Sequence, residues 1–220
     1  SSMFNDAAEY EQIDAVPKLP KRLRMDNTKD RYLSMEEEMA FKELFGLFGF
    51  PMYVDLVTFL IETGCRFSEA QRAITAHVNT RNQTISFLKT KNSNPRTIKC
   101  TKTLWEVVSR RLTSNARGHL FPGLDYKAFE RQWNRCKGRM GLAHDEQLTI
   151  HTCRHTMATR MITHVSLPEL MHYGGWKTLA AVQRYIHLNV SSLGNAVAAL
   201  ENEREQLALH CEDPHSGRDR

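Results

Sequence analysis

Apolar residues recur at helical spacing over most of the chain, and this pattern predicts a mainly α fold. The first helix is expected to begin at a capping box formed by Ser34 and Glu37, and the chain then breaks between Gly46 and Pro51. A second, strongly apolar helix is expected to stop at Gly64. The predicted helices cover about 34–45, 52–63, 68–73, 102–113, 125–140, 151–163, 168–173, 178–188 and 192–209.

One short region instead alternates apolar and polar residues with a period of two, which is the spacing of a half-buried strand. It covers residues 84–88, and a return strand is expected at 96–100 after an Asn-rich turn at 92–95. The predicted fold is therefore mainly α with a small antiparallel β-hairpin, and the chain contains no internal repeat.

Three segments follow from this pattern. Residues 1–33 hold Pro17, Pro20 and many basic side chains with little apolar periodicity, so we expect a flexible basic arm or linker. Such an arm can lie along a phosphate backbone or remain a solvated tail, and its residues fit both interpretations. Residues 34–190 are expected to form the folded domain, and 191–220 a C-terminal helix with an acidic tail.

The composition is that of an ordinary globular protein, with 41% hydrophobic and 25% charged residues among 220. These fractions exclude the disordered, collagen-like and coiled-coil classes. No run of about 18 apolar residues is present, so no membrane span is expected, and the N-terminus lacks the pattern of a signal peptide. Five cysteines without a C-x-x-C pair argue against disulfides and zinc and indicate a reducing compartment, the cytoplasm.

Charge is distributed unevenly along the chain. The formal net charge is +5, but the first 14 residues carry four acids and no base, and the last 20 carry six acids against three bases. Taking those −4 and −3 away from the total leaves +12 for residues 15–200. A body this basic suits a polyanionic partner such as nucleic acid.

Reactive side chains gather in three short stretches of the sequence. Arg66 follows a helix-ending glycine in apolar surroundings, so it needs an anion, which Glu69 or a ligand phosphate could supply. His151 and Arg154 are three residues apart and share one face of a helix. Two arginines and a histidine would make a phosphate clamp, because the planar guanidinium grips two oxygens and keeps its charge. Each residue alone also has an ordinary structural interpretation, and Tyr185 could be a core tyrosine.

Together and in this order, these stretches resemble the tyrosine recombinase family, the phage-integrase type of site-specific recombinases. Residues 63–69 are similar to the family's T-G-x-R-x-x-E box, and residues 151–156 are similar to its H-x-x-R-H-[ST] box. Trp176 and Tyr185 are nine residues apart, as are the family's His or Trp and its nucleophilic Tyr. The resemblance extends over about 31–188 and implies the tyrosine recombinase catalytic-domain fold.

The resemblance also implies a role for each matching residue. The implied catalytic set is Arg66, Lys91, His151, Arg154, Trp176 and Tyr185, with Glu69 and His155 in support. The two arginines would bind the non-bridging oxygens of the scissile phosphate and stabilise its transition state. Tyr185 would attack phosphorus and form a 3′-phosphotyrosyl link, and His151 would assist proton movement at the tyrosine.

The remaining roles are less direct. Lys91 would protonate the leaving 5′-oxygen from the hairpin turn, with Lys89 as the alternative. Trp176, at a position where the family more often has His, would donate its indole N–H and pack the site, unless it is plain core. Glu69 would orient the first arginine or the histidine, and His155 would support the packing around the clamp.

The implied function is a site-specific DNA recombinase, a phage or prophage integrase that works without metal, ATP or another cofactor. Its partner would be a double-stranded DNA attachment site in a bacterial cell, with the arm at 17–31 leading from a separate core-binding domain. The C-terminal segment would pack in cis or link a homotetramer on DNA, and accessory DNA-bending proteins can take part. The alternatives are a type IB topoisomerase-like enzyme and a catalytically silent DNA-binding regulator.

Overall fold

The helices and strands of the chain are seen in a computed structural model that describes residues 31–88, 95–115, 117–186 and 201. The helices are α2 (Met35–Leu47), α3 (Pro51–Thr63), α4 (Phe67–Arg72), α5 (Lys102–Ser114), α6 (Tyr126–Arg139), α7 (Thr152–Met161), α8 (Leu167–Gly174) and α9 (Ala180–Gln183). A 3-10 turn η1 (Thr75–His77) precedes the strands β1 (Val78–Asn79), β2 (Thr84–Phe87) and β3 (Arg96–Lys99). The mainly helical fold with a small antiparallel sheet is thus confirmed.

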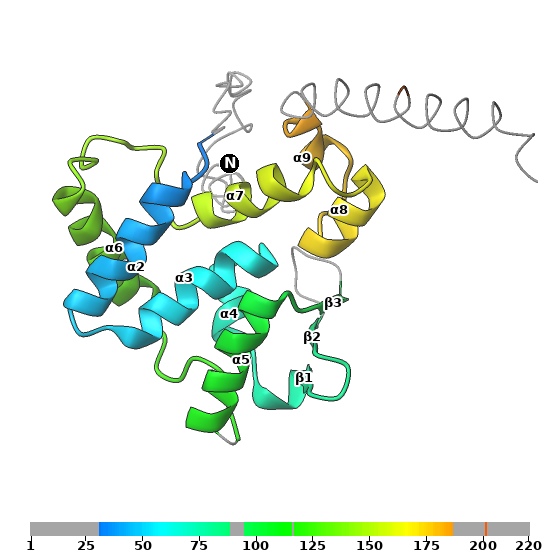
Figure 1. The fold of residues 1–220 in the computed structure, drawn as a ribbon, viewed down its shortest axis with the longest axis horizontal. Coiled ribbons are helices and arrows are strands. Elements are labelled where there is room, and N and C mark those ends of the chain that lie inside the picture. Colours follow the sequence, from blue (N-terminus) through cyan, green and yellow to red (C-terminus); the bar gives the residue numbers. More distant parts are fainter. Residues whose placement is uncertain (1–30, 89–94, 116, 187–200, 202–220) are drawn as a thin grey trace, which may run out of the picture.

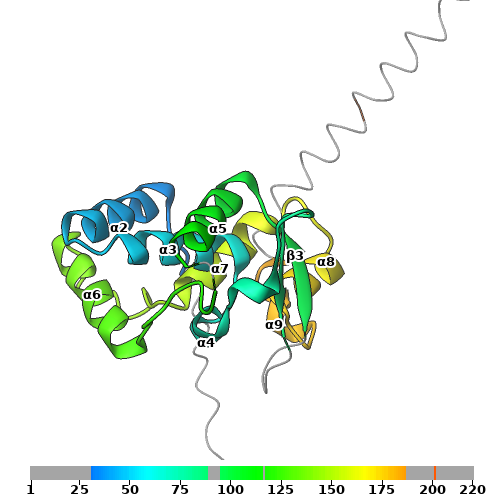
Figure 2. The same ribbon diagram turned by 90° about the horizontal axis from the view of Figure 1, so that it is seen from below.

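Helix α3 lies in the middle of the molecule and packs against α2, α5 and α7 (Figure 1). Figure 2 shows the same order from another side, with α2 and α6 at one end and the sheet, α8 and α9 at the other. The helix ends at Gly64, whose φ of 58° is left-handed. A Cβ on this glycine would lie 1.9 Å from the Met157 side chain, so only glycine fits where the chain turns away from α3.

The sheet has the order β1-β2-β3, and both pairs are antiparallel. Strands β2 and β3 pair with Ile85 opposite Ile98, which confirms the predicted antiparallel hairpin. Strand β1 was not predicted, because its two residues are too few to show an alternating pattern. The predicted turn at 92–95 falls almost wholly outside the described residues.

Buried side chains form a main core and a second, smaller cluster. The main core contains stacked aromatic rings, among them Phe41 and Trp133 with ring centroids 4.0 Å apart. The smaller cluster lies between α7, α8 and α9 and consists of Met157, Ala158, Ile162, Leu170, Trp176, Val182 and Tyr185. Two of the predicted site residues therefore belong to an apolar cluster of their own.

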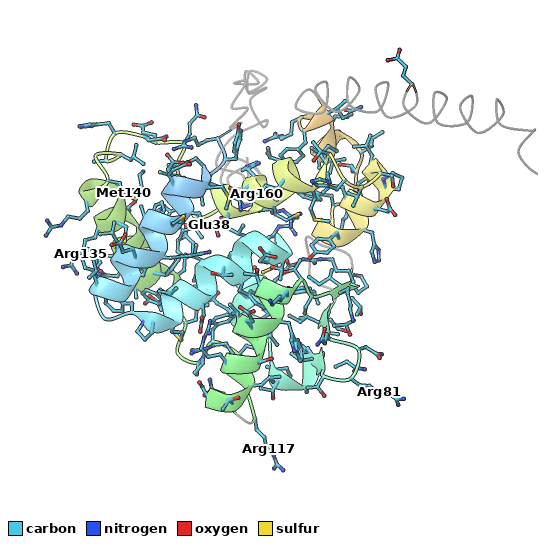
Figure 3. All side chains as sticks on the ribbon, in the orientation of Figure 1. Glu38, Arg81, Arg117, Arg135, Met140 and Arg160 are labelled. Carbon is cyan, nitrogen blue, oxygen red and sulfur yellow. The ribbon has the colours of Figure 1, made fainter. Side chains whose placement is uncertain are left out.

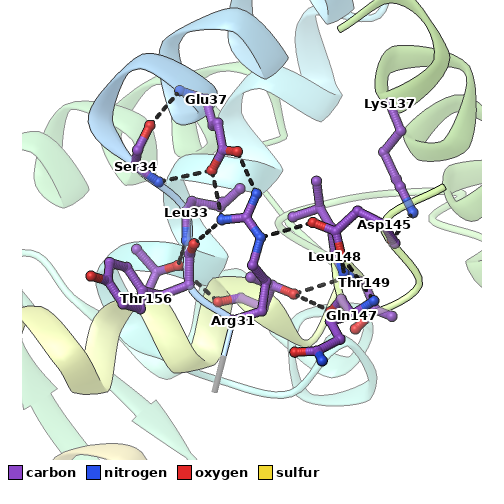
Figure 4. Close-up of polar contacts among 12 residues, drawn as sticks. Arg31, Leu33, Ser34, Glu37, Lys137, Asp145, Gln147, Leu148, Thr149 and Thr156 are labelled. Carbon is purple, nitrogen blue, oxygen red and sulfur yellow. Dashed lines mark hydrogen bonds and ion pairs between the residues drawn. The ribbon is translucent and has the colours of Figure 1, made fainter. Parts of the chain in front are cut away.

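The first described residues are fixed to the folded domain by a polar clasp around Arg31 (Figure 4). The Arg31 guanidinium pairs with Glu37 on α2 and with Asp145, whose Oδ2 lies 2.9 Å from Nε. The Leu33 N–H donates to the Thr156 hydroxyl on α7 at 2.8 Å. These contacts attach the entering chain to two helices at once.

A second ion pair joins the same two helices. Nη1 of Arg160 on α7 lies 2.6 Å from a carboxylate oxygen of Glu38 on α2, and both residues are labelled in Figure 3. Glu38 is buried, so this pair ties α7 to α2 beneath the surface.

Several predicted boundaries differ from the structure. The helix expected at 151–163 is α7, which begins one residue later and ends at Met161. Of the helix expected at 178–188, residues up to 186 are described. They form α9 and then a turn at residues 184–185. Of the arm predicted at 1–33, residues 1–30 lie outside the described residues, and the clasp holds residues 31–33 against the folded domain. The predicted helix at 192–209 also lies outside them, apart from residue 201.

Candidate functional site

Arg66 stands at the start of α4, two residues after the left-handed Gly64. Its backbone N–H donates to Oε2 of Glu69 at 2.9 Å, while its Nη1 lies 3.9 Å from Oε1 of the same residue, too far for a hydrogen bond. Nη1 is buried and has no hydrogen-bond partner among the described residues, although the side chain as a whole is 30% exposed. The guanidinium therefore keeps donor capacity for a ligand.

Arg154 lies in the first turn of α7 and is only 2% exposed. Its Nη1 donates to the carbonyl oxygens of Gly64 at 2.5 Å and Gly174 at 2.6 Å, which joins the end of α3 to the end of α8. Its Nη2 is buried and has no hydrogen-bond partner in the part of the chain that the structure describes. A buried donor without a partner is costly, so this nitrogen marks a place where an anion would be stabilised.

The charge of Arg154 is influenced by its surroundings. Burial, followed by repulsion from Arg66 and Arg96, lowers its pKa to about 10. Arg154 is still protonated at neutral pH at that value. Arg66 and Arg154 are 88 positions apart in the sequence, but they lie close together because Arg154 binds the carbonyl of Gly64, two residues before Arg66.

Glu69 is buried beneath this site and pairs mainly with Arg96 from strand β3. Its two carboxylate oxygens accept hydrogen bonds from Arg96 at 3.2 and 3.1 Å. The Arg96 side chain is fully buried, stacks over the Phe87 ring at 4.4 Å and donates from Nε to the Tyr173 carbonyl at 2.8 Å. Glu69 therefore connects the backbone of Arg66 to the hairpin.

Arg96 was not predicted as a site residue. The signal for it was an arginine where strand alternation calls for an inward-facing side chain, since β3 alternates buried and exposed from Arg96 onward. An arginine at an inward position needs a carboxylate partner, and Glu69 lies 27 residues away in the sequence, too far for a local pattern to reveal.

His151 precedes α7 and is exposed. Desolvation by the surrounding protein, followed by the charges of its neighbours, lowers its pKa to about 4. These neighbours are His155, Arg154, Arg66 and Arg184. His151 is therefore neutral at pH 7.

Tyr185 is 4% exposed and lies in the small apolar cluster with Trp176, whose ring centroid is 5.9 Å away. Its hydroxyl shares a hydrogen bond with Nδ1 of His155 at 2.6 Å. The sequence predicted His155 only as a packing residue and assigned proton movement at the tyrosine to His151. The structure places His155 against the hydroxyl, and His151 packs edge-on against the His155 ring with centroids 5.1 Å apart.

Trp176 packs against the clamp with its ring face. The Arg154 guanidinium lies over this ring at 4.0 Å, a cation–π contact that holds Arg154 in place. A Cβ on Gly174 would lie 1.9 Å from the indole, so a glycine is needed for the ring to fold back onto the end of α8. The expected hydrogen bond from its indole N–H to a phosphate stays a prediction.

Most of the predicted site is thus brought together. Within the described residues, Arg66, His151, Arg154, Trp176 and Tyr185 converge, with Glu69 and His155 directly behind them. Lys91 and Lys89 lie in the undescribed range 89–94, so the choice between them stays open. No group of three or more His, Cys, Asp or Glu residues that could hold a metal ion occurs in the described ranges.

The two cysteines beside the arginines are buried. Burial raises the pKa of Cys65 to about 12 and raises the pKa of Cys153 further. Both thiols are therefore protonated at neutral pH, as expected for inert core cysteines. Among the helices that the structure describes, none is long and apolar enough to cross a membrane.

Comparison with known proteins places this geometry in a family. The model of the phage integrase family matches residues 51–192. The integrase of Escherichia phage P2 is 29% identical over 179 residues, which cover 81% of this chain and 49% of that protein. The chain therefore spans about half the length of this curated relative.

Solved structures agree with this match. The catalytic domain of bacteriophage HP1 integrase is 26% identical, with a TM-score of 0.59 over 76% of this chain and 93% of that one. The Tn1549 transposon integrase in complex with transposon right end DNA has a TM-score of 0.66 at 17% identity, over 91% of this chain and 76% of that one. The fold is that of a tyrosine recombinase catalytic domain, and the chain belongs to the phage integrase family.

Proposed function

We propose that this chain is the catalytic part of a site-specific DNA recombinase, a phage or prophage integrase that cuts and rejoins DNA through a 3′-phosphotyrosyl link. One observation carries the proposal. Arg66 and Arg154 each keep a buried nitrogen without a hydrogen-bond partner among the described residues, and Arg154 contacts the Trp176 ring, which lies against Tyr185. A phosphodiester would satisfy both nitrogens and place its phosphorus within reach of a tyrosine oxygen.

The arginines would act mainly on the transition state. When an oxygen attacks phosphorus, negative charge grows on the non-bridging oxygens, and fixed guanidinium donors then bind more strongly than in the ground state. Arg154 is fixed before DNA arrives by the Gly64 and Gly174 carbonyls and by Trp176. Glu69 accepts a hydrogen bond from the Arg66 backbone N–H, and Arg96 fixes the Glu69 carboxylate in turn.

The attacking oxygen must lose a proton, and the leaving 5′-oxygen must gain one, so each needs its own acid or base. Tyr185 supplies the attacking oxygen, and a histidine of the H-x-x-R-H stretch can take its proton. Lys91, or Lys89 in its place, would give a proton to the leaving 5′-oxygen. The phosphotyrosyl bond retains the energy of the broken phosphodiester, so rejoining the strand needs no ATP.

The partners follow from the same proposal. The Tn1549 transposon integrase and the XerH recombinase were solved with DNA, and the +12 body of this chain favours a DNA partner as well. In this proposal the chain acts in the cytoplasm of a bacterial host. It forms a homotetramer linked through the C-terminal segment, and accessory DNA-bending proteins take part.

The test is covalent capture of DNA. The full chain is incubated with a pool of nicked duplexes whose central sequence is randomised, and adducts that survive denaturation are separated on a gel and sequenced. We expect a protein–DNA adduct enriched in one sequence, and no adduct with Tyr185→Phe. Sequence-independent relaxation of supercoiled plasmid would instead support the topoisomerase-like alternative. Binding without any adduct would support the silent regulator.

A further inference from the structure

The hydrogen bond between His155 and Tyr185 reaches the oxygen of the proposed nucleophile, and no implied role explains it. The two atoms are 2.6 Å apart, a short distance for nitrogen and oxygen, and both side chains are buried, with 8% and 4% of their surface exposed. A buried bond of this kind fixes the hydroxyl in one position. His155 follows Arg154 directly on α7, so the clamp and the partner of the hydroxyl sit on the same helical turn.

The charges around the pair decide which atom holds the proton at rest. Positive charges gather at the clamp next to this pair, from Arg154 on α7, Arg66 just before α4 and Arg184 after α9. Positive neighbours oppose a second proton on the His155 ring. A neutral imidazole has one protonated nitrogen and one acceptor, so a ring that carries its proton on Nε2 accepts from the tyrosine at Nδ1.

DNA binding would change this balance. A phosphodiester in the clamp brings negative charge next to Arg66 and Arg154 and cancels part of the field that opposes an imidazolium. The His155 ring then becomes a better base at the moment when the tyrosine must lose its proton. His151 is turned edge-on to this ring, and the hydroxyl's hydrogen bond is made to His155.

We propose that His155 is a catalytic residue, whose Nδ1 holds the Tyr185 hydroxyl at rest and takes its proton when the oxygen attacks phosphorus. This inference rests on the proposed function. In the step, the tyrosine O–H bond breaks, an N–H bond forms on His155, and an oxygen–phosphorus bond forms. The bond from phosphorus to the 5′-oxygen breaks, and that oxygen takes a proton from a protonated lysine of the hairpin. Rejoining the strand runs the same transfers backward.

The hydrogen bond is tested without DNA. In the full chain labelled with ¹⁵N histidine, NMR distinguishes a protonated from an unprotonated Nδ1, and the His155→Asn spectrum assigns the signal. We expect an unprotonated Nδ1 on His155 that shifts in Tyr185→Phe. A proton on Nδ1 at neutral pH would overturn the proposal, because the tyrosine would then be the acceptor.

The proton transfer is tested by the rate of adduct formation on the captured nicked duplex, measured in a single turnover across pH. The Asn in His155→Asn places an oxygen near the position of Nδ1, so it can hold the hydroxyl but cannot take its proton. We expect a loss of at least about 100-fold, the usual contribution of general base catalysis. The loss should come with unchanged DNA binding and a changed pH profile.

His164→Asn, at an exposed histidine outside the site, is the matched control. It should leave the rate and its pH profile unchanged, and a melting curve checks that each variant folds. A His155→Asn protein that reacts within about threefold of wild type, with the same pH profile, would overturn the role of His155 while leaving the recombinase intact. A wild-type chain that forms no adduct with any nicked duplex would instead remove the proposed function, and the NMR result would still stand.

Discussion

At the scale of single residues, the site contains groups held in an unfavourable state until a ligand arrives. Arg154 is buried with one nitrogen lacking a partner among the described residues, and burial followed by nearby positive charge lowers the pKa of His151. Their motifs were visible in the sequence, but their partners were not. The carbonyls that fix Arg154 lie 90 and 20 positions away, and no local spacing predicts such contacts.

Tyr185→Phe should abolish the covalent adduct and leave DNA binding unchanged, because it removes only the attacking oxygen. The variant also loses the hydrogen bond to His155, so we expect a stability loss of about 1–2 kcal/mol. Adduct gels and urea denaturation measure the two effects. Tyr173→Phe is the matched control, since the Tyr173 hydroxyl donates to the Glu62 carbonyl and not to His155. An adduct that persists in Tyr185→Phe and disappears in Tyr173→Phe would move the nucleophile.

His151 should make the protein less stable in mild acid. Its folded pKa, about 4, lies below the ordinary value of 6.5, so the unfolded chain binds more protons between these values. Stability should therefore fall as the pH drops from about 6.5 to 4, by about 1 kcal/mol once solvent screening is considered. Denaturant titrations at several pH values test this, with His151→Gln as the comparison. A wild type and a His151→Gln variant with parallel pH profiles would contradict the expected linkage.

At the scale of elements, the chain's helices followed their apolar spacing closely, while short elements and element ends did not. Strand β1 has two residues, and α9 keeps only four of the eleven predicted at 178–188 within the described range. Such short pieces are set by tertiary contacts rather than by their own pattern. Arg96 shows the same limit, because its buried pair with Glu69 joins β3 to α4 and no local rule announces it.

Arg96→Met should destabilise the fold by about 3–5 kcal/mol, since it leaves the buried Glu69 carboxylate without its partner. The double variant Arg96→Met, Glu69→Leu removes both charges and should be less destabilised than Arg96→Met alone. Urea unfolding of wild type, both single variants and the double variant gives the coupling energy. Equal and additive losses would mean that the pair contributes nothing beyond the separate side chains.

At the scale of the whole molecule, a basic body carries one clamp with two nitrogens free of partners in the described ranges. The net charge and the motif order pointed to a nucleic-acid partner from the sequence alone. The contacts between the three motif stretches could be seen only in the folded chain. Arg154 joins them by donating to the carbonyls of Gly64 and Gly174.

DNA binding by this chain should be weak, poorly discriminating and steeply dependent on salt, because its contacts would be mainly to phosphates. We expect affinity to fall by orders of magnitude between about 50 and 200 mM salt. Titration of fluorescent duplexes at several salt concentrations measures the slope, and Arg66→Gln should reduce it by about one phosphate contact. The exposed Arg81 serves as the control position, as Arg81→Gln. Tight, salt-insensitive binding to one sequence would contradict this expectation.

The clasp at Arg31 gives the arm a mechanical connection to the chemistry. Leu33 is bonded to Thr156, two residues after Arg154 on α7, and the Arg31 side chain braces the same entry point against α2 and Asp145. These contacts join the chain at residue 33 to α7, the helix that carries Arg154, and brace it at residue 31. A displacement of the chain at Arg31 is therefore expected to move α7 and the Arg154 guanidinium with it.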